Sequence, residues 1–349
     1  MPQNTQPPTA AAPASGSGAL SDIMPDIILA RSVAPSDDST SIVLPPAVEP
    51  QIQIGAVGVT AHTNIVYATH KDSDGKDVSL RLDLLVPQTP GAKPVVVYLP
   101  GGGFVLANKD AAFERRTYVA EAGYAVASVE YRTVRNGTTY REAVADAKSA
   151  IRFLRAHAAD YGLDPSKAAV WGESAGGYVA SMVGTTHGIA EFETPDNAAF
   201  SSDVRAVVNQ FGLSHLLKYI DDFDPESQQA LLRPGTPASA FIFGPNAGRS
   251  LADDPKAVAE ADPTGYVTPE TPPFLHFHGS ADDVVPPSQS LLLHTALLEK
   301  GVESTRYVLT GAKHGDLAAM LGEPAAALPW STTEILGYIT AFLAKHLGS

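Results

Sequence analysis

The chain has no cysteine among its 349 residues, and its basic residues are few. Disulfide bonds, zinc sites built on thiolates and cysteine nucleophiles are therefore excluded. No stretch approaches the roughly 20 consecutive apolar residues that a membrane-spanning helix needs. Only 24 Lys and Arg stand against 38 Asp and Glu, for a net charge of −14. Nucleic acids and anionic membranes bind clustered Lys and Arg, so neither is expected as a partner.

The remaining composition is that of an ordinary globular protein, with 44% apolar and 18% charged residues. Residues 1–18 are rich in Pro, Ala, Thr, Ser and Gln, without the basic and apolar regions of an export signal. We interpret residues 1–50 as a disordered or surface-draped leader and residues 51–349 as the folded domain. The missing signal favours a cytoplasmic location, unless a signal was removed before this numbering began.

Two kinds of apolar pattern follow along the chain. Residues 64–68 and 78–86 predict an antiparallel pair of strands around the Asp-rich turn 71–77. After residue 91, short unbroken apolar runs alternate with helical segments. Strands are expected at 95–99, 125–131, 168–171, 204–211, 274–278 and 305–309, and helices near 111–122, 141–160, 175–184, 288–300 and 332–347. This alternation predicts an α/β fold with a mostly parallel central sheet and helices on both faces.

Residues 214–267 interrupt this alternation. They contain no clear strand and many Pro, Gly and Asp residues, with apolar side chains at 231–232 and 241–243. A connection of this length inside a compact domain is typically functional or disordered. We interpret it as a small lid insertion, and an insertion that only covers surface is the alternative.

A serine stands between two glycines in Gly172-Glu173-Ser174-Ala175-Gly176, at the step from an apolar strand to a helix. So tight a turn has no room for side chains on either side of the serine, and glycine leaves that room. The serine hydroxyl then projects beyond the sheet, as in the nucleophile elbow of serine hydrolases. Ser174 is therefore the candidate nucleophile.

A serine nucleophile needs a base, and the base needs an acid that orients it. His314 follows the last predicted strand, and Asp282 and Asp283 follow the strand before it. Because sites form at the carboxyl ends of parallel strands, these side chains are expected to meet Ser174 there. For His314, a turn without a catalytic role is the alternative.

Two further histidines, His276 and His278, lie on the strand before Asp282. We interpret both as structural, with a hydrogen bond from His278 that helps to reverse the chain. By ligand type they could form a metal site with Asp282 or Asp283. Such a site would compete with the base for the same acid, so we expect no metal and no cofactor.

Three glycines follow the strand 95–99 in Pro100-Gly101-Gly102-Gly103-Phe104. Glycine lets backbone N–H groups face a ligand without obstruction, and the N–H of Ala175 begins a helix whose dipole favours negative charge. The loop and Ala175 are therefore candidate donors to an oxyanion. A flexible turn is the alternative for the loop.

Together these motifs resemble the α/β-hydrolase esterases of the hormone-sensitive-lipase and bacterial feruloyl-esterase-like branches, over residues 62–347. The shared features are Gly101-Gly102-Gly103, Tyr131-Arg132, the runs 146–154 and 161–166, Gly172-Glu173-Ser174-Ala175-Gly176-Gly177, His278-Gly279-x-x-Asp282-x-x-Val285-Pro286 and Gly311-Ala312-x-His314-Gly315. The resemblance implies Asp282 as the acid, three residues after His-Gly, and Gly102 and Gly103 as oxyanion donors. This chain departs from it at Pro100, where the family commonly has a histidine that braces the loop by hydrogen bonding.

The motifs and the resemblance predict a carboxylic-ester hydrolase in which residues 51–349 are an α/β-hydrolase catalytic domain. Phe104, Val105 and the lid are expected to line the pockets for a small-molecule substrate, a small or aromatic ester rather than long-chain fat. One alternative is a C–N hydrolase, aryl-formamidase or peptidase-like, with the same triad. Another is a non-catalytic ligand-binding homologue. The sequence leaves the oligomeric state open.

Overall fold

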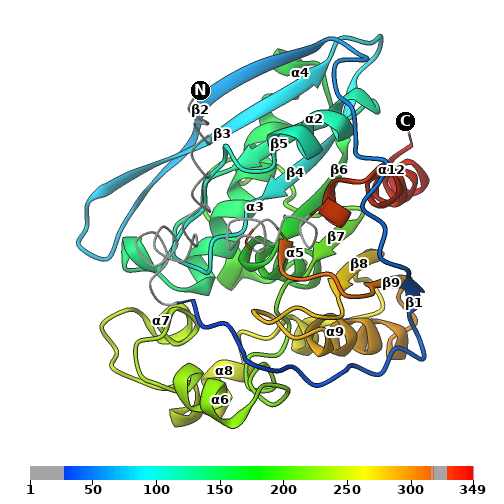
Figure 1. Ribbon diagram of the computed structural model, residues 1–349. Helices are drawn as coiled ribbons and strands as arrows, with labels where there is room; N and C mark the ends of the chain where they lie inside the picture. Colours follow the sequence, from blue (N-terminus) through cyan, green and yellow to red (C-terminus); the bar gives the residue numbers. More distant parts are fainter. Residues whose placement is uncertain (1–26, 316, 318–327, 349) are drawn as a thin grey trace, which may run out of the picture.

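The computed structural model describes residues 27–315, 317 and 328–348. Within that part of the chain, nine strands form one sheet (Figure 1). In their order across the sheet they are β1 (Ile42–Leu44), β9 (Ser304–Leu309), β8 (Phe274–Gly279), β7 (Val207–Gln210), β6 (Leu163–Glu173), β4 (Lys93–Leu99), β5 (Ala125–Val129), β3 (Asp77–Pro87) and β2 (Val59–Lys71). β3 pairs antiparallel with both β2 and β5, and the remaining pairs of this sheet are parallel. The predicted mostly parallel sheet with antiparallel N-terminal strands is confirmed.

Helices cover both faces of the sheet (Figure 1). α3 (Tyr140–Ala156), α5 (Ala175–Thr185) and α9 (Ser288–Glu299) bury apolar side chains in the core on one face. α2 (Phe113–Glu121) and α12 (Thr333–Leu347) do the same on the other face. None of the helices in the described ranges combines the length and apolar character that crossing a membrane requires.

The central strand β4 shows why an unbroken apolar run predicts a parallel strand. Its side chains alternate between the two faces, with Val95, Val97 and Leu99 in one core and Val96 and Tyr98 in the other. All five are buried. Since helices cover both faces, a polar side chain in this strand would lose its water without a partner.

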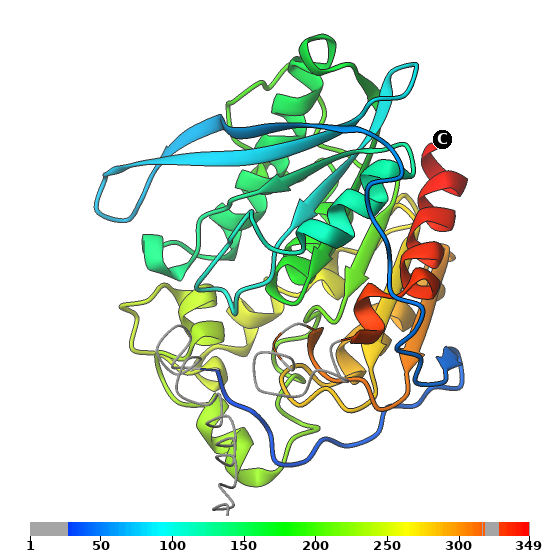
Figure 2. The same cartoon turned by 45° about the horizontal axis from the view of Figure 1, so that its top comes forward.

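The segment between β7 and β8, which contains the predicted lid, is helical and irregular rather than extended. Its α-helices are α6 (Pro225–Leu231), α7 (Pro237–Phe243) and α8 (Pro255–Ala259). Each begins with a proline directly after a residue whose side chain accepts a backbone N–H, namely Asp224, Thr236 and Asp254. These helices lie together beyond the carboxyl ends of the parallel strands, in the yellow-green part of Figures 1 and 2.

Residues 27–50 run from this helical segment to the edge of the sheet (blue in Figure 1). Val33 forms a bridge with Phe223, and β1 pairs in parallel with β9. The sequence analysis placed no strand here, because three residues are too few to show a periodic pattern. Residues 1–26 of the predicted leader lie outside the described residues.

Candidate active site

Ser174 occupies the sharp turn between β6 and α5. Its backbone has φ 54° and ψ −122°, a conformation that costs a residue with a side chain about 1–3 kcal/mol. A Cβ atom on Gly172 would lie 2.1 Å from the carbonyl oxygen of Gly176, and one on Gly176 would lie 2.0 Å from that of Leu99. Neither position has room for a side chain, so both must be glycine. The Ser174 N–H donates to the Gln210 carbonyl at 2.9 Å, which ties the turn to β7.

A continuous line of hydrogen bonds joins Ser174, His314 and Asp282. Nε2 of His314 lies 2.8 Å from Ser174 Oγ, and Nδ1 lies 2.8 Å from Asp282 Oδ2. The carboxylate can only accept, so Nδ1 carries the proton and donates to it. Nε2 of the neutral imidazole is then left to accept the Ser174 hydroxyl. The candidate nucleophile, base and acid thus lie together in the geometry that nucleophile activation requires.

Asp282 is fully buried at the carboxyl end of β8. Its Oδ1 accepts the N–H groups of Val284 and Val285 at 3.0 and 2.9 Å. Burial by itself raises the pKa of this carboxyl, but His314 and His278 outweigh burial and hold the pKa well below its ordinary value. Asp282 therefore stays ionised beside the imidazole that it orients.

Of the polar residues next to this line, Asp283 and His278 have partners of their own, and His276 lies in the core. Asp283 faces Lys313, whose Nζ lies 3.1 Å from its Oδ2. His278 Nε2 donates to the Val285 carbonyl at 2.9 Å, which closes the loop after β8. His276 is fully buried and has no hydrogen-bond partner among the described residues, and burial holds its pKa well below its ordinary value. Its ring is therefore neutral and packs in the core.

The glycine loop approaches Ser174 from the end of β4. A Cβ atom on Gly101 would lie 3.1 Å from the Ser174 Cβ. Gly103 has φ 59°, a left-handed conformation that favours glycine. Among the residues that the structure describes, none accepts a hydrogen bond from the N–H of Gly102, Gly103 or Ala175. They are the three N–H groups that the sequence analysis named as candidate oxyanion donors.

Phe104, one of the two expected pocket residues, is buried. Its ring stacks on Phe241 of α7 with the centroids 4.2 Å apart, and it meets Tyr178 of α5 edge-on at 5.7 Å. Phe104 thus links the glycine loop to the helical segment between β7 and β8. Val105 beside it is half-buried. Contact of either side chain with a substrate stays a prediction.

The sequence analysis missed two contacts that support the site. Arg115 of α2 forms a buried bidentate ion pair with Glu173, with nitrogen–oxygen distances of 3.2 and 3.0 Å. The ring of Phe211 packs edge-on against His314, with the centroids 4.9 Å apart. The signal for the first contact was Glu173 itself, a charge at the end of an apolar strand. Its partner lies far away in the sequence, so no local pattern identifies it.

The family model named BD-FAE matches residues 82–297, more than half of the chain. The chain belongs to the BD-FAE family. This is a family of α/β-hydrolase esterases, in agreement with the fold that the motifs predicted and the sheet confirms.

The relatives of this BD-FAE chain include named esterases. It is 28% identical to the isoprenylcysteine alpha-carbonyl methylesterase of Arabidopsis thaliana over 239 residues, 68% of this chain and 54% of the relative. It is 29% identical to the esterase LipQ of Mycobacterium tuberculosis over 251 residues, 70% of this chain and 54% of the relative. The solved structure of a thermophilic esterase from the planctomycete Thermogutta terrifontis is 26% identical with a TM-score of 0.59, and the match covers 83% of this chain and 92% of that one. The chain spans about half the length of the curated relatives it matches.

Proposed function

We propose that this protein is a carboxylic-ester hydrolase that works through an acyl-enzyme. The observation that carries the proposal is the line from Asp282 through His314 to Ser174, with both contacts at 2.8 Å. Ala175 directly follows Ser174, and the glycine loop approaches the same serine, since a Cβ atom on Gly101 would lie 3.1 Å from the Ser174 Cβ. Membership of the BD-FAE family and relatives such as the esterase LipQ support the same class of reaction.

The proposed reaction has two halves that use the same groups. Ser174 Oγ attacks the ester carbonyl carbon while His314 Nε2 takes the hydroxyl proton, and the oxyanion accepts hydrogen bonds from Gly102, Gly103 and Ala175. The tetrahedral intermediate collapses, and the alcohol leaves with the proton from His314. Water then attacks the acyl-enzyme by the same route and releases the acid. Throughout, the ionised acid partner holds the imidazole in one tautomer and stabilises its protonated form.

We propose a small or aromatic ester as the substrate and the 214–267 insertion as the lid of a catalytic domain spanning 51–349. Phe241 of α7 stacks directly on Phe104, so the insertion packs against the loop that carries the oxyanion donors. Ile27 also approaches this loop, since its Cδ1 lies 3.8 Å from where a Cβ on Gly103 would stand. With Phe241 and Ile27 this close to the loop, little space is left beside the ester carbonyl that we place there. A short acyl chain or a flat ring is therefore favoured over a long flexible chain.

The first test is the hydrolysis of p-nitrophenyl esters from acetate to decanoate by the native protein and by Ser174→Ala. We expect the highest kcat/KM on the short chains and a loss of about 10⁶-fold in kcat in the variant. Ser166→Ala, an exposed serine substitution, is the matched control and should leave kcat within twofold. Retained activity in Ser174→Ala would show that another residue is the nucleophile.

Matched p-nitroanilides separate ester from amide hydrolysis at the same site. An amide has the poorer leaving group, which must be protonated as it departs. We expect kcat/KM on the ester to exceed that on the anilide by several orders of magnitude. A higher value on the anilide would replace the esterase proposal with a C–N hydrolase.

A further inference from the structure

The glycine loop receives three hydrogen bonds from residues 131–134, which follow β5 and which we call the brace. The bonds run from Tyr131 Oη to the Pro100 carbonyl (2.7 Å), from Thr133 Oγ1 to the Val105 carbonyl (3.2 Å) and from the Val134 N–H to the Phe104 carbonyl (3.1 Å). In every case the loop contributes a carbonyl oxygen. The brace therefore holds the loop without using any N–H of its glycines.

The brace is anchored at its second residue, Arg132. Its backbone N–H and its Nε both donate to Asp146 Oδ2 at 2.9 Å, and Nη2 donates to Oδ1 at 2.8 Å. Nη1 donates to the carbonyl of Lys71, at the end of β2, at 2.8 Å. The Asp146 side chain, on α3, is fully buried. A single carboxylate thus fixes both the side chain and the backbone of Arg132.

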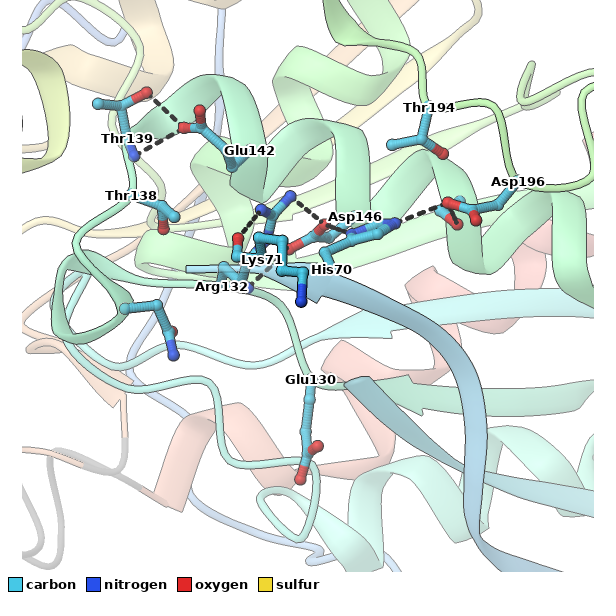
Figure 3. Close-up of polar contacts among 12 residues, drawn as sticks. His70, Lys71, Glu130, Arg132, Thr138, Thr139, Glu142, Asp146, Thr194 and Asp196 are labelled. Carbon is cyan, nitrogen blue, oxygen red and sulfur yellow. Dashed lines mark hydrogen bonds and ion pairs between the residues drawn. The ribbon is translucent and has the colours of Figure 1, made fainter. Parts of the chain in front are cut away.

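His70 holds the same carboxylate from β2. Its Nδ1 lies 2.7 Å from Asp146 Oδ1, and its Nε2 lies 2.6 Å from Asp196 Oδ2. Figure 3 shows the resulting row of side chains from Arg132 through Asp146 and His70 to Asp196. Both partners of His70 only accept, so the two bonds require a protonated ring, and the hydrogen bond to Asp146 raises its pKa above the ordinary value. The Arg132 guanidinium and the protonated His70 ring then face the carboxylates of Asp146 and Asp196. The two positive charges compensate the buried negative charge of Asp146.

The loop lacks a support that the resemblance leads one to expect. Proline has no N–H, and its ring cannot donate a hydrogen bond, so Pro100 offers the loop only a fixed φ and a carbonyl oxygen. That oxygen accepts the hydroxyl of Tyr131, which is 3% exposed. Because water hardly reaches this bond, it is stronger than the same bond would be at the surface.

We propose that Tyr131, with the cluster of Arg132, Asp146 and His70 behind it, positions the oxyanion loop. The inference rests on the proposed esterase function and deepens it. None of the four touches the reacting atoms, so they are positioning residues. Hydrogen bonds to the oxyanion reach full strength only in the transition state. A loop that shifts by a few tenths of an ångström therefore lowers kcat and leaves KM almost unchanged.

The first variant is Tyr131→Phe, with Tyr67→Phe as its matched control. The Tyr67 hydroxyl is also buried and donates to a backbone carbonyl, that of Glu130 at 2.5 Å, without contacting the loop. Each variant loses one buried hydrogen bond, so both melting temperatures should fall by similar amounts. We expect Tyr131→Phe to lower kcat about tenfold with KM within twofold, and Tyr67→Phe to leave both within twofold. Equal kinetics in the two variants would reduce Tyr131 to a purely structural role.

The second variant is His70→Gln. The glutamine amide can donate to only one of the two carboxylates that His70 bonds, Asp146 or Asp196. At pH 6 we expect kcat to fall about threefold with KM unchanged. The difference from the native protein should shrink as the pH rises through the raised pKa of His70, because the neutral ring keeps only one of its two bonds. His157→Gln is the control, because His157 pairs with Asp160 at 2.9 Å on the surface, and it should match the native profile.

The rate of amide hydrogen exchange in residues 100–106 measures how firmly the loop is held, and it requires no enzymatic turnover. We expect faster exchange in Tyr131→Phe and His70→Gln and unchanged exchange in Tyr67→Phe and His157→Gln. If the loop loosens as expected but the native protein hydrolyses no ester, the esterase function fails and the positioning of the loop stands. Unchanged exchange in Tyr131→Phe, or unchanged kcat of that variant in an active enzyme, overturns the inference.

Discussion

Asp282 and Asp283 are neighbours in the chain, and their surroundings separate them. Asp282 is fully buried and accepts hydrogen bonds from two backbone N–H groups and from His314. Asp283 pairs with Lys313, and its side chain is 21% exposed. Because the pKa of Asp282 lies well below its ordinary value, its contribution to stability is present at neutral pH. That contribution is lost only as the pH falls through the lowered pKa.

The two aspartates should therefore respond differently to the same substitution. In Asp282→Asn the amide can donate to the ring, which favours the wrong tautomer of His314, so we expect kcat to fall about 10⁴-fold. In Asp283→Asn we expect kcat within threefold of the native value. Steady-state hydrolysis of p-nitrophenyl butyrate measures both. Similar losses in the two variants would contradict the assignment of the acid.

Among the elements, the insertion between β7 and β8 contains a buried carboxyl group, Asp262, beside the half-buried His215. Asp262 precedes the short helix η4 (Pro263–Tyr266), and its Oδ1 accepts the N–H of Leu216 at 2.9 Å. Its Oδ2 lies 3.2 Å from Nδ1 of His215. Burial raises the pKa of Asp262 to about 7 despite the Leu216 N–H, and burial lowers the pKa of His215. Below about pH 7 Asp262 is therefore a neutral carboxylic acid, beside an imidazole whose charged form burial disfavours.

This pair makes the stability of the protein depend on pH. Between about pH 4 and pH 7, folded Asp262 keeps a proton that the unfolded chain has released, so its contribution to stability falls across this interval and is lost above about pH 7. Asp262→Asn retains a donor and an acceptor but does not titrate. We expect the melting temperature of the native protein, relative to this variant, to be several degrees lower at pH 8 than at pH 5. Circular dichroism measures the transitions.

Asp221→Asn changes an exposed residue on the same segment and serves as the control. Its melting temperature should follow the native curve at both pH values. If the melting temperature of Asp262→Asn also runs parallel to the native curve, burial does not raise the pKa of Asp262.

Over the whole molecule, the segment 27–44 connects regions that are far apart in the sequence. Ile27 reaches the glycine loop, and the Ala30 N–H donates to the carbonyl of Asp283 at 2.8 Å. Arg31 donates to Glu226 of α6 at 2.9 Å. The segment thus contacts the glycine loop, the loop that follows β8 and the proposed lid before it joins the sheet as β1.

Removing this segment should change which esters the protein accepts. A chain that begins at Pro35 keeps β1 but loses the contacts of Ile27, Ala30 and Arg31. Compared with a chain that begins at Ile27, we expect the ratio of kcat/KM for a naphthyl ester to that for the acetate to rise about tenfold. Melting temperatures should show that both chains fold. An unchanged ratio would mean that the segment does not limit the space at the site.

The sequence by itself predicted the order of the strands from β2 to β9 and of the helices that cover the sheet, and it named the residues of the candidate site. Apolar periodicity and the steric demand of the turn at Ser174 act between neighbours in the chain, so a local pattern records them. It did not distinguish Asp282 from Asp283 without the resemblance, because adjacent carboxylates are alike until burial separates them. It also did not reveal the pair of Arg115 with Glu173, the stack of Phe104 on Phe241, or the brace. Only the tertiary structure decided these contacts, because each depends on burial, ring stacking, hydrogen bonding or charge compensation between residues that the chain keeps far apart.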